Sequence, residues 1–428
     1  MKSNTHGRNR QFVLRRTVVV GAVTAWVVFG GSVAIASGSF QTWLAGLWPE
    51  AQAVGVSRAT FEAATRGLEP DLTLPDLVIP GRPERPRGEQ AEFVQTPADY
   101  LKEAALARLA AQGRKLLAEH RATLAAIEQQ FGVTGAVVLA VWGRETGYGA
   151  AKLPHSAIRA LATQAYLGRR KEQFRAELVL ALKMLEEGHV ALAAMRSSWA
   201  GAMGQPQLLP SGFYKHAVDF DGDGRRDIFG SVPDSLATIA KHLADLGWQR
   251  GQRWAYEVRA PQTVDCTIAE PATQLPVAEW IRRGYAPADG RAPARDGTAP
   301  ASLLLPEGTY GPAFLTLKNY YVLKDYNFSD LYVLFVGNLA DRIAGAGPFA
   351  TPWSQAAQLR TEEVEAIQRH LTARAFYADK IDGKAGMLTR AALGAYQKAH
   401  GLRLDCWPTR AVLDHMHAAQ RSPAPPAR

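Results

Sequence analysis

Residues 136–149 constrain the fold most, because an apolar run ends there in one arginine and one glutamate and glycines follow at once. The spacing predicts a helix in which Trp142, Val141 and Val138 stand three, four and seven positions before Glu145. Glu145 is therefore expected on the buried face of this helix, near its end. Burial disfavours the charged form of a carboxyl group and would raise its pKa. Glu145 is accordingly a candidate general acid, and the alternative is a glutamate satisfied by a nearby arginine.

The N-terminus has the pattern of an export signal. The first sixteen residues carry five basic side chains and no acid, and residues 17–49 carry no charged side chain. The small residues of Ala34-Ile35-Ala36 are acceptable for cleavage. We predict an export signal or an uncleaved membrane anchor over residues 1–36, which places the working part outside the cytoplasmic membrane.

Charge and cysteine content narrow the partners. The 428 residues carry a formal net charge of +9, spread along the chain rather than gathered in runs. This distribution does not favour nucleic-acid binding, whereas a mild basic excess suits an anionic polymer such as a cell wall. Cys266 and Cys406 lie far apart in the sequence, and we expect them not to form a disulfide.

The chain divides into segments of different composition. Residues 71–97 are rich in Pro, Gly and Arg, which predicts an extended surface connection and no core element. Helical spacing then dominates to about residue 251, residues 252–318 suggest a small, partly β-structured insertion, and helix returns over 320–342. We predict a mainly α fold with these segments: signal or anchor 1–36, catalytic region 37–346, linker 347–360, a small helical domain 361–418, and a disordered tail 419–428.

A stretch at residues 198–210 suits a binding groove. Its glycines, Gly201 and Gly204, would bring backbone close to its neighbours. Its polar side chains, which include Ser198 and Gln207, offer hydrogen bonds. Small residues, amides and an aromatic together suit a sugar chain, and the alternative is a tightly packed helix junction. For Trp199 alone, packing in the core is the better interpretation.

An acidic loop follows. Asp219, Asp221 and Asp223 stand at positions 1, 3 and 5 of a calcium loop of the EF-hand type, with glycine at position 6. Position 12 should be a glutamate but is Gly230, so the match covers only the first half. Asp234 could replace the missing ligand or could cap the following helix. The alternative is an Asp-Gly turn that binds no metal.

Several enzyme classes are poorly supported by the sequence. The ten histidines form no HExxH pattern, and no Gly-x-Ser-x-Gly elbow or phosphate-binding loop is present. Zinc enzymes, nucleophilic hydrolases and NTPases are therefore not indicated.

These stretches occur together and in order in a known family. The motifs are residues 142–149 (WGRETGYG), 161–166 (LATQAY), Arg169-Arg170, 198–204 (SWAGAMG), 217–224 (AVDFDGDG) and Tyr326-Asn327. The chain resembles the membrane-bound lytic murein transglycosylase B family over residues 40–345. The tail resembles a small helical peptidoglycan-binding module, through residues 381–386 (IDGKAG), Thr389, Tyr396-Gln397 and Gly401-Leu402.

The resemblance implies a lysozyme-like domain in the periplasm of a Gram-negative bacterium, with attachment to the inner membrane and wall-synthesis complexes as further options. It would cut the β-1,4 bond between N-acetylmuramic acid and N-acetylglucosamine without water. Glu145 would act first as acid and then as base, leaving a 1,6-anhydro end. By position, the glycan cleft would be lined by Ser198, Gln207, Arg169, Arg170, Tyr326, Asn327 and Tyr332. Calcium would be held by Asp219, Asp221 and Asp223.

The chain departs from the family pattern at several positions. Leu208-Leu209 replaces Phe-Met, Gly147 stands where Asn is common, and Cys406 stands where glycine is expected. These changes concern substrate contacts and one turn. Two alternatives to the expected activity stay open: a wall-binding scaffold without catalysis, and a muramidase that uses water.

Overall fold

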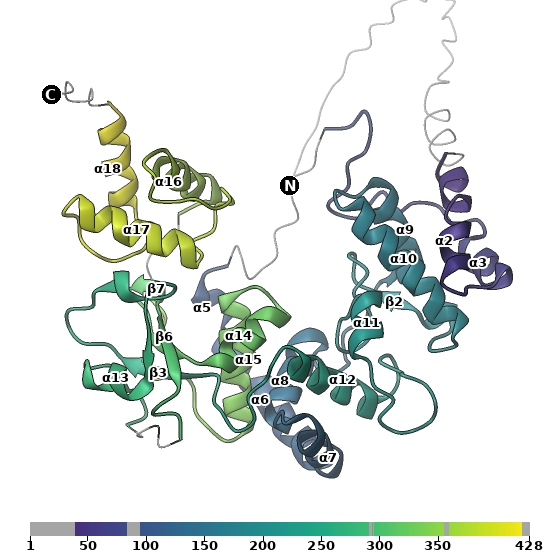
Figure 1. Cartoon of the computed structure of the whole chain (residues 1–428), viewed down its shortest axis with the longest axis horizontal. Coiled ribbons are helices and arrows are strands. Elements are labelled where there is room, and N and C mark those ends of the chain that lie inside the picture. Colours follow the sequence, from purple (N-terminus) through teal and green to yellow (C-terminus); the bar gives the residue numbers. More distant parts are fainter. Residues whose placement is uncertain (1–38, 84–94, 291–292, 294, 355–358, 422–428) are drawn as a thin grey trace, which may run out of the picture.

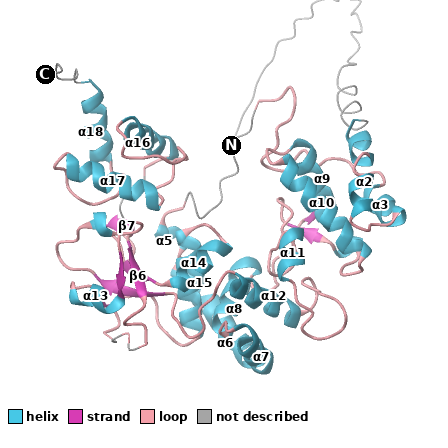
Figure 2. Ribbon diagram, in the orientation of Figure 1, coloured by secondary structure: helices cyan, strands magenta, loops and turns pink. Residues whose placement is uncertain are grey.

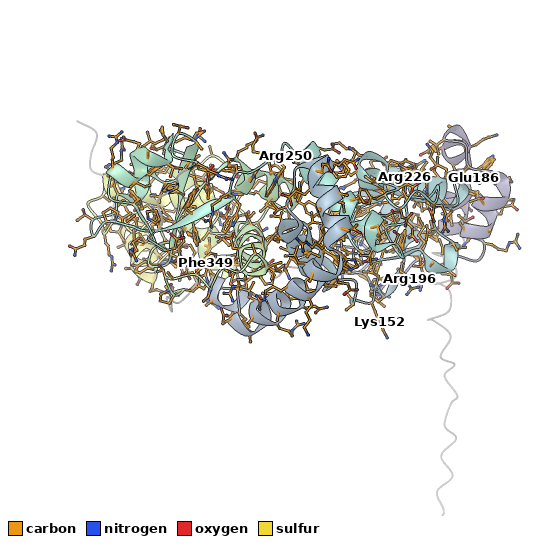
Figure 3. All side chains as sticks on the ribbon, turned by 90° about the horizontal axis from the view of Figure 1, so that it is seen from below. Lys152, Glu186, Arg196, Arg226, Arg250 and Phe349 are labelled. Atoms are coloured by element: carbon orange, nitrogen blue, oxygen red, sulfur yellow. A yellow bond between two sulfur atoms is a disulfide. The ribbon has the colours of Figure 1, made fainter. Side chains whose placement is uncertain are left out.

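The computed structural model describes residues 39–83, 95–290, 293, 295–354 and 359–421. The predicted signal at 1–36 lies outside these residues. Helices dominate the fold, and most of the strands gather in one region, apart from a short pair near α11 (Figure 2). This confirms the mainly α class with a small, partly β insertion. Glu186 and Phe349 lie in opposite halves of the molecule (Figure 3).

The helices before the sheet are α2 (Trp48–Ala53), α3 (Arg58–Thr65), α5 (Pro97–Tyr100), α6 (Glu103–Glu119), α7 (Arg121–Phe131), α8 (Gly135–Thr146), α9 (Ala157–Leu167), α10 (Lys171–Glu186), the 3-10 turn η1 (Leu192–Ala194), α11 (Pro210–His216) and α12 (Val232–Asp245). Within and after the sheet region stand η2 (Cys266–Ile268), α13 (Val277–Arg282), α14 (Lys318–Tyr326), α15 (Asp330–Ile343), α16 (Thr361–Ala373), α17 (Met387–Ala399) and α18 (Arg410–Arg421).

The insertion contains a five-stranded antiparallel sheet in the order β4-β6-β8-β3-β5. Its strands are β3 (Ala255–Arg259), β4 (Gln274–Pro276), β5 (Ala286–Pro287), β6 (Pro300–Leu304) and β8 (Ala313–Thr316), with β7 (Pro306–Thr309) beside them. A separate short pair joins β1 (His155–Ser156) to β2 (Arg196–Ser197). Trp280 of α13 is fully buried against the sheet, and its indole N–H donates to the carbonyl of Ala301 at 2.8 Å.

Helix α8 lies in the centre of the larger core. It packs against α15, α6 and α12, and Val138 to Val141 are fully buried. A helix surrounded on several sides carries apolar residues around most of its circumference, which explains its near-continuous apolar run. Gly147 ends the helix in the left-handed region (φ 58°), a conformation that glycine and asparagine adopt most easily.

The prediction of one helix over residues 320–342 is wrong in one respect, because this segment forms two helices. The chain breaks at residues 327–329, where Asn327 is extended (φ −148°). The Ser329 hydroxyl accepts the backbone N–H of Tyr332 at 3.4 Å and caps α15. The capping serine stabilises a new helix start there, and this local bond competes with continuation of α14.

The prediction that residues 71–97 form a surface connection without core residues is also wrong for the first part of this segment. Leu74 and Leu77 are only 1% and 3% exposed, and they pack against Ala160 and Leu167. The backbone N–H of Val78 donates to the carbonyl of Leu167 at 2.7 Å. Two leucines three residues apart provide enough apolar surface to bury this segment despite its proline content.

The expectation that the cysteines do not pair is wrong. Cys266 of η2 and Cys406 form a disulfide across a sequence separation of 140 residues. Their regions meet because the C-terminal helices dock on the sheet, where Tyr310 donates to Asp405 at 2.7 Å. Cys406 has φ 52°, in the left-handed region, which agrees with the glycine expected at this position.

The segment predicted as a linker is held against the sheet in its described part. The backbone N–H groups of Ala350 and Thr351 donate to the Glu257 carboxylate at 2.8 and 2.7 Å. Phe349 packs on Phe314. These contacts fix the chain on its way from α15 to the C-terminal helices.

Among the described residues, no single helix is long and apolar enough to cross a membrane. The pair α7 and α8 passes the same test of length and composition when taken together, with a bend of 106° between them.

His216 and His242 stack on each other beside the core, and from this arrangement we expect the protein to be less stable against unfolding at acid pH. His242 stacks on His216 with ring centroids 4.0 Å apart, and burial lowers the pKa of His242 to about 3. A neutral histidine in the fold that titrates near 6.5 when unfolded contributes stability above pH 6.5, which is lost as the pH falls toward 3. The protein is expected to lose about 2–3 kcal/mol through this group between pH 7 and 4.5.

Denaturant unfolding at both pH values measures this effect. His242→Gln should narrow the stability difference between pH 7 and 4.5, whereas the exposed His400→Gln should leave it unchanged. An equal difference in wild-type and His242→Gln protein would contradict the assignment.

Candidate active site

Glu145 is the penultimate residue of α8, and it is partly rather than fully buried. Its Oε1 accepts a hydrogen bond of 2.6 Å from the Tyr332 hydroxyl, in the first turn of α15. α8 and α15 pack directly on each other, so two regions of the sequence 187 residues apart meet at this bond. A partly buried carboxyl group that accepts a hydrogen bond from a tyrosine hydroxyl can exchange a proton with a ligand that reaches it.

Two tyrosines stand together beside the acid. The rings of Tyr326 and Tyr332 are parallel within 7°, with centroids 6.3 Å apart. Burial raises the pKa of Tyr332 well above its usual value, and the nearby Glu145 raises it further. The same two causes, in the same order, raise the pKa of Tyr326. Both hydroxyls therefore stay protonated and act as hydrogen-bond donors at neutral pH.

Arg144 is engaged by aromatic side chains. Its guanidinium lies 4.6 Å from the ring centroid of Tyr100 and 5.1 Å from that of Phe335, and it donates to the Tyr100 hydroxyl. Arg144, the neighbouring arginine that could have paired with the Glu145 carboxylate, thus interacts with these side chains of α5 and α15.

The 198–210 stretch folds as the close-packed loop that its glycines predict. A Cβ at Gly204, where φ is 66°, would lie 2.6 Å from the carbonyl oxygen of Ile228. The Ser198 hydroxyl accepts the N–H groups of Ala200 and Ala202 at 3.3 and 3.2 Å. Gln207 has φ 57° and donates to the carbonyl of Gly204 at 2.9 Å. Trp199 is only partly buried, and it packs against the small cluster around Leu74.

This loop is joined to the acid's helix and to the tyrosine pair. The Thr146 hydroxyl donates to the carbonyl of Gln205 at 3.1 Å, and the Tyr326 hydroxyl donates to the carbonyl of Pro206 at 2.9 Å. The structure therefore brings together Glu145, both tyrosines and residues 204–207. Asn327 lies in the break between α14 and α15, next to Tyr326.

The arginine pair has a different setting. Arg169 Nε lies 3.2 Å from Asp76 Oδ1, and Arg170 Nη2 lies 4.0 Å from Asp76 Oδ2. Arg170 also lies over the ring of Phe174, with its guanidinium carbon 4.9 Å from the centroid. These arginines belong to the lobe built by α9 and α10 (Figure 1).

Sequence reasoning missed two residues that organise the site. Thr146 bonds the loop beside Glu145, and Asp76 holds the arginine pair. Thr146 could have been noticed within the motif at 142–149. Asp76 gave no signal, because it lies in the segment taken for a surface connection.

The acidic loop brings three carboxylates together. One oxygen each of Asp219, Asp221 and Asp223 lies within 4.8 Å of the others. Position 12 cannot carry a larger residue without displacement, because a Cβ at Gly230 would lie 2.8 Å from Asp227 Oδ2. The three predicted ligands thus fit a cation, and the fourth expected ligand is missing.

Asp234 neither replaces the missing calcium ligand nor caps the following helix. It is fully buried, and its oxygens accept the N–H groups of Phe220 and Asp227, each at 2.8 Å. Ser231 caps α12, since its hydroxyl accepts the N–H of Asp234 at 3.2 Å. Asp234 therefore holds the loop backbone from inside.

Comparison with known families finds matches to two regions of the chain. The family described as "Transglycosylase SLT domain" matches residues 39–341, and the family described as "Putative peptidoglycan binding domain" matches residues 360–416. Among curated proteins, Membrane-bound lytic murein transglycosylase B of Escherichia coli (strain K12) is 29% identical over 217 residues. That match covers 50% of this chain and 58% of the relative, so the chain spans little more than half of the relative's length.

Two solved structures match more of the chain. They are crystal structures of SltB3 from Pseudomonas aeruginosa, one in complex with NAG-anhNAM-pentapeptide and one with NAG-NAM-pentapeptide. Their sequences are 39% and 38% identical in the aligned regions, both with a TM-score of 0.79. Each alignment covers 88% of this chain and 99% of the other.

Proposed function

Because the chain belongs to the transglycosylase SLT domain family, we propose that it is a lytic murein transglycosylase. It cleaves the β-1,4 bond between N-acetylmuramic acid and N-acetylglucosamine in peptidoglycan and leaves 1,6-anhydro ends. The proposal rests on the hydrogen bond that the Tyr332 hydroxyl donates to Glu145 at the end of α8. The SltB3 complex with NAG-anhNAM-pentapeptide supports the anhydro product.

The reaction uses Glu145 twice. The protonated carboxyl group gives its proton to the glycosidic oxygen, and the bond from C1 to this oxygen breaks. The resulting carboxylate takes the proton of the muramoyl 6-hydroxyl, and the 6-oxygen forms the new bond to C1. Atoms balance without water, and one carboxyl group suffices, whereas ordinary glycosidases use two across the bond. The Tyr332 hydroxyl stabilises the carboxylate between the two steps.

The glycan lies along the loop at 198–210 and the break between α14 and α15. Ser198, Gln207, Tyr326 and Asn327 line its path next to the acid, and Arg169 and Arg170 line a more distant part. Tyr332 contacts Glu145 and bounds the floor of the site. The C-terminal module, residues 361–418, binds peptidoglycan and holds the enzyme on its substrate.

The protein works in the periplasm, after export through the segment at 1–36 or attached by it to the inner membrane. Complexes that synthesise the cell wall at this location are further partners of the protein. Its basic net charge favours the anionic wall.

Digestion of purified peptidoglycan, followed by mass spectrometry of the released fragments, tests the proposal. Fragments lighter by one water than the hydrolysis products support a transglycosylase. Ordinary reducing ends would show a muramidase that uses water, and no release would show a wall-binding scaffold.

We also propose that Asp219, Asp221 and Asp223 hold a calcium ion with a structural role. Three carboxylate oxygens this close repel one another, and a divalent cation with oxygen ligands relieves the repulsion. The backbone is already arranged for it, because Gly222 and Gly224 donate to the Asp219 carboxylate at 2.8 and 2.9 Å.

Calcium is therefore expected to stabilise the protein. Addition of about 1 mM CaCl₂ should raise the melting temperature by about 2–6 °C, and a chelator should reverse this. Asp221→Asn should reduce the shift, whereas the exposed Asp99→Asn should keep it. Titration calorimetry without a heat of binding would contradict a calcium site here.

A further inference from the structure

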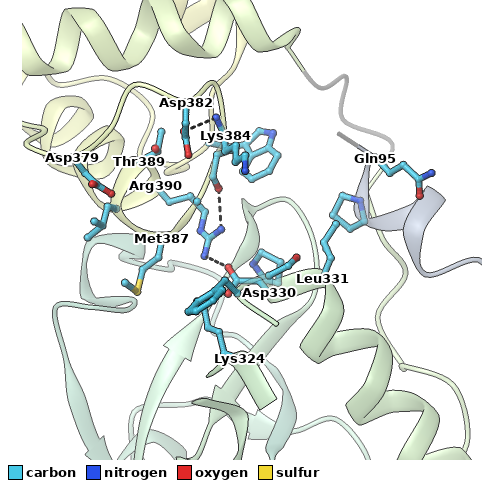
Figure 4. Close-up of a pocket in the computed structure, with 18 of the residues that line it drawn as sticks. Gln95, Lys324, Asp330, Leu331, Asp379, Asp382, Lys384, Met387, Thr389 and Arg390 are labelled. Atoms are coloured by element: carbon cyan, nitrogen blue, oxygen red, sulfur yellow. Dashed lines mark hydrogen bonds and ion pairs between the residues drawn. The ribbon is translucent and has the colours of Figure 1, made fainter. Parts of the chain in front are cut away.

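One of the contacts between the C-terminal module and the catalytic region is made by a buried guanidinium. Arg390 of α17 is 8% exposed, and its Nη2 donates to Asp330 Oδ2 at 3.0 Å (Figure 4). Its Nη1 donates to the carbonyl of Ala385 at 2.9 Å, within the module. Burying an arginine is costly unless acceptors meet it, so these bonds hold the two parts in one arrangement.

Asp330 is the centre of this buried network. Besides Arg390, it accepts the Tyr320 hydroxyl at 2.6 Å and the Lys324 ammonium at 2.5 Å, both from α14. Glu270 is 5% exposed and lies 3.6 Å from Arg390 Nη2. Burial alone would raise the pKa of Asp330, but Lys324 and Arg390 hold it well below its usual range. Asp330 thus stays charged and joins α14, α15 and the module.

The position of Asp330 connects this network to the catalytic acid. Asp330 is the first residue of α15, and Tyr332, which donates to Glu145, is the third. The last residue of α14 is Tyr326, which stacks on Tyr332. The corner between α14 and α15 therefore carries both tyrosines of the site and, between them in the sequence, Asp330 of the buried network.

We infer that Arg390 of the peptidoglycan-binding module is a positioning residue for the reaction, holding through Asp330 the first turn of α15 that presents Tyr332 to Glu145. The inference rests on the proposed function and adds a second task to the module. Loss of the guanidinium removes a charge-assisted bond from Asp330 Oδ2 and the nearby cation from Glu270. The corner then loses a restraint on the side that faces the module.

The module stays attached when this bond is lost. The disulfide from Cys266 to Cys406 and the bond from Tyr310 to Asp405 remain. An effect of Arg390 on the reaction therefore does not require release of the module. Lys398 supplies a matched control, since it crosses the same boundary to Asp265 at 3.3 Å but is 63% exposed and does not contact Asp330.

The test uses the full-length protein and solubilised, uncrosslinked glycan strands. Arg390→Met is expected to lower kcat about 10- to 100-fold with KM changed less than about twofold. Arg390→Lys should recover much of the loss, and Lys398→Met should match the wild type. Binding of insoluble peptidoglycan should be equal in all four proteins. Asp330→Asn should lower kcat similarly, and the double variant should lose no more than either single variant.

The inference is overturned if Arg390→Met keeps the wild-type kcat, or if Arg390→Lys and Arg390→Met lose equally. Should Arg390→Met fail to fold in a thermal melt, Asp330→Asn decides, and a wild-type kcat in that variant overturns the inference. A wild-type protein that releases no fragments defeats the proposed function itself and removes the reaction that Arg390 would serve. Wild-type release of anhydro fragments, matched by Arg390→Met, defeats only the inference.

Discussion

Glu145→Gln is expected to lower kcat on peptidoglycan by about 10³-fold or more, because the amide can neither give the first proton nor take the second. The substitution keeps the shape of the side chain and lets the Tyr332 hydroxyl donate to the amide oxygen. Melting temperature and binding to insoluble peptidoglycan should therefore stay within error of the wild type. Release of soluble fragments from labelled peptidoglycan measures the loss.

Glu119→Gln is the matched control for this result. Glu119 is the last residue of α6 and has a side chain that is 66% exposed. The same chemical change at this helix end should leave activity intact. Normal cutting by Glu145→Gln would show that the acid has been assigned wrongly.

Tyr332→Phe is expected to lower kcat by about 10- to 100-fold. The removed hydroxyl donates a 2.6 Å hydrogen bond to Glu145, and a bond to a charged group contributes about 1.5–3 kcal/mol. The carboxylate between the two proton transfers loses this stabilisation, whereas the ring keeps its stacking on Tyr326. Steady-state kinetics on solubilised glycan strands measures the effect, which should fall on kcat more than on KM.

Tyr396→Phe controls for removal of a buried tyrosine hydroxyl elsewhere. Its hydroxyl lies 3.0 Å from His415 Nδ1, inside the C-terminal module. This variant should keep kcat. If Tyr332→Phe were as active as Tyr396→Phe, the Tyr332 hydroxyl would have no role in the reaction.

The sequence predicted the central helix well, because local spacing determines which face a helix buries. The positions of Val138, Val141 and Trp142 relative to Glu145 predicted a helix that ends at the following glycine. The acid is less buried than that spacing suggested, since its place in the last turn leaves it partly open. The glycines at 201 and 204 likewise predicted close backbone approach, which depends on the small size of glycine and on the positive φ that it adopts easily.

Contacts between residues far apart in the sequence could not be predicted from local sequence patterns. The disulfide depends on how the C-terminal helices dock on the sheet, and neither cysteine carries a local sign of its partner. The same holds for Arg390 and Asp330, which lie 60 residues apart in the sequence. Ser329 was a readable signal, because a serine before an acidic residue often begins a helix, but the apolar spacing around it concealed the break.

The proposed reaction requires that the 6-hydroxyl of the sugar, and not water, closes onto C1. Digestion of purified peptidoglycan in water enriched with oxygen-18, with mass spectrometry of the released fragments, tests it directly. We expect fragments that are lighter by one water than hydrolysis products and carry no oxygen-18 at the new end, as closure by the 6-hydroxyl requires. Reducing ends that carry oxygen-18 from the solvent would contradict it.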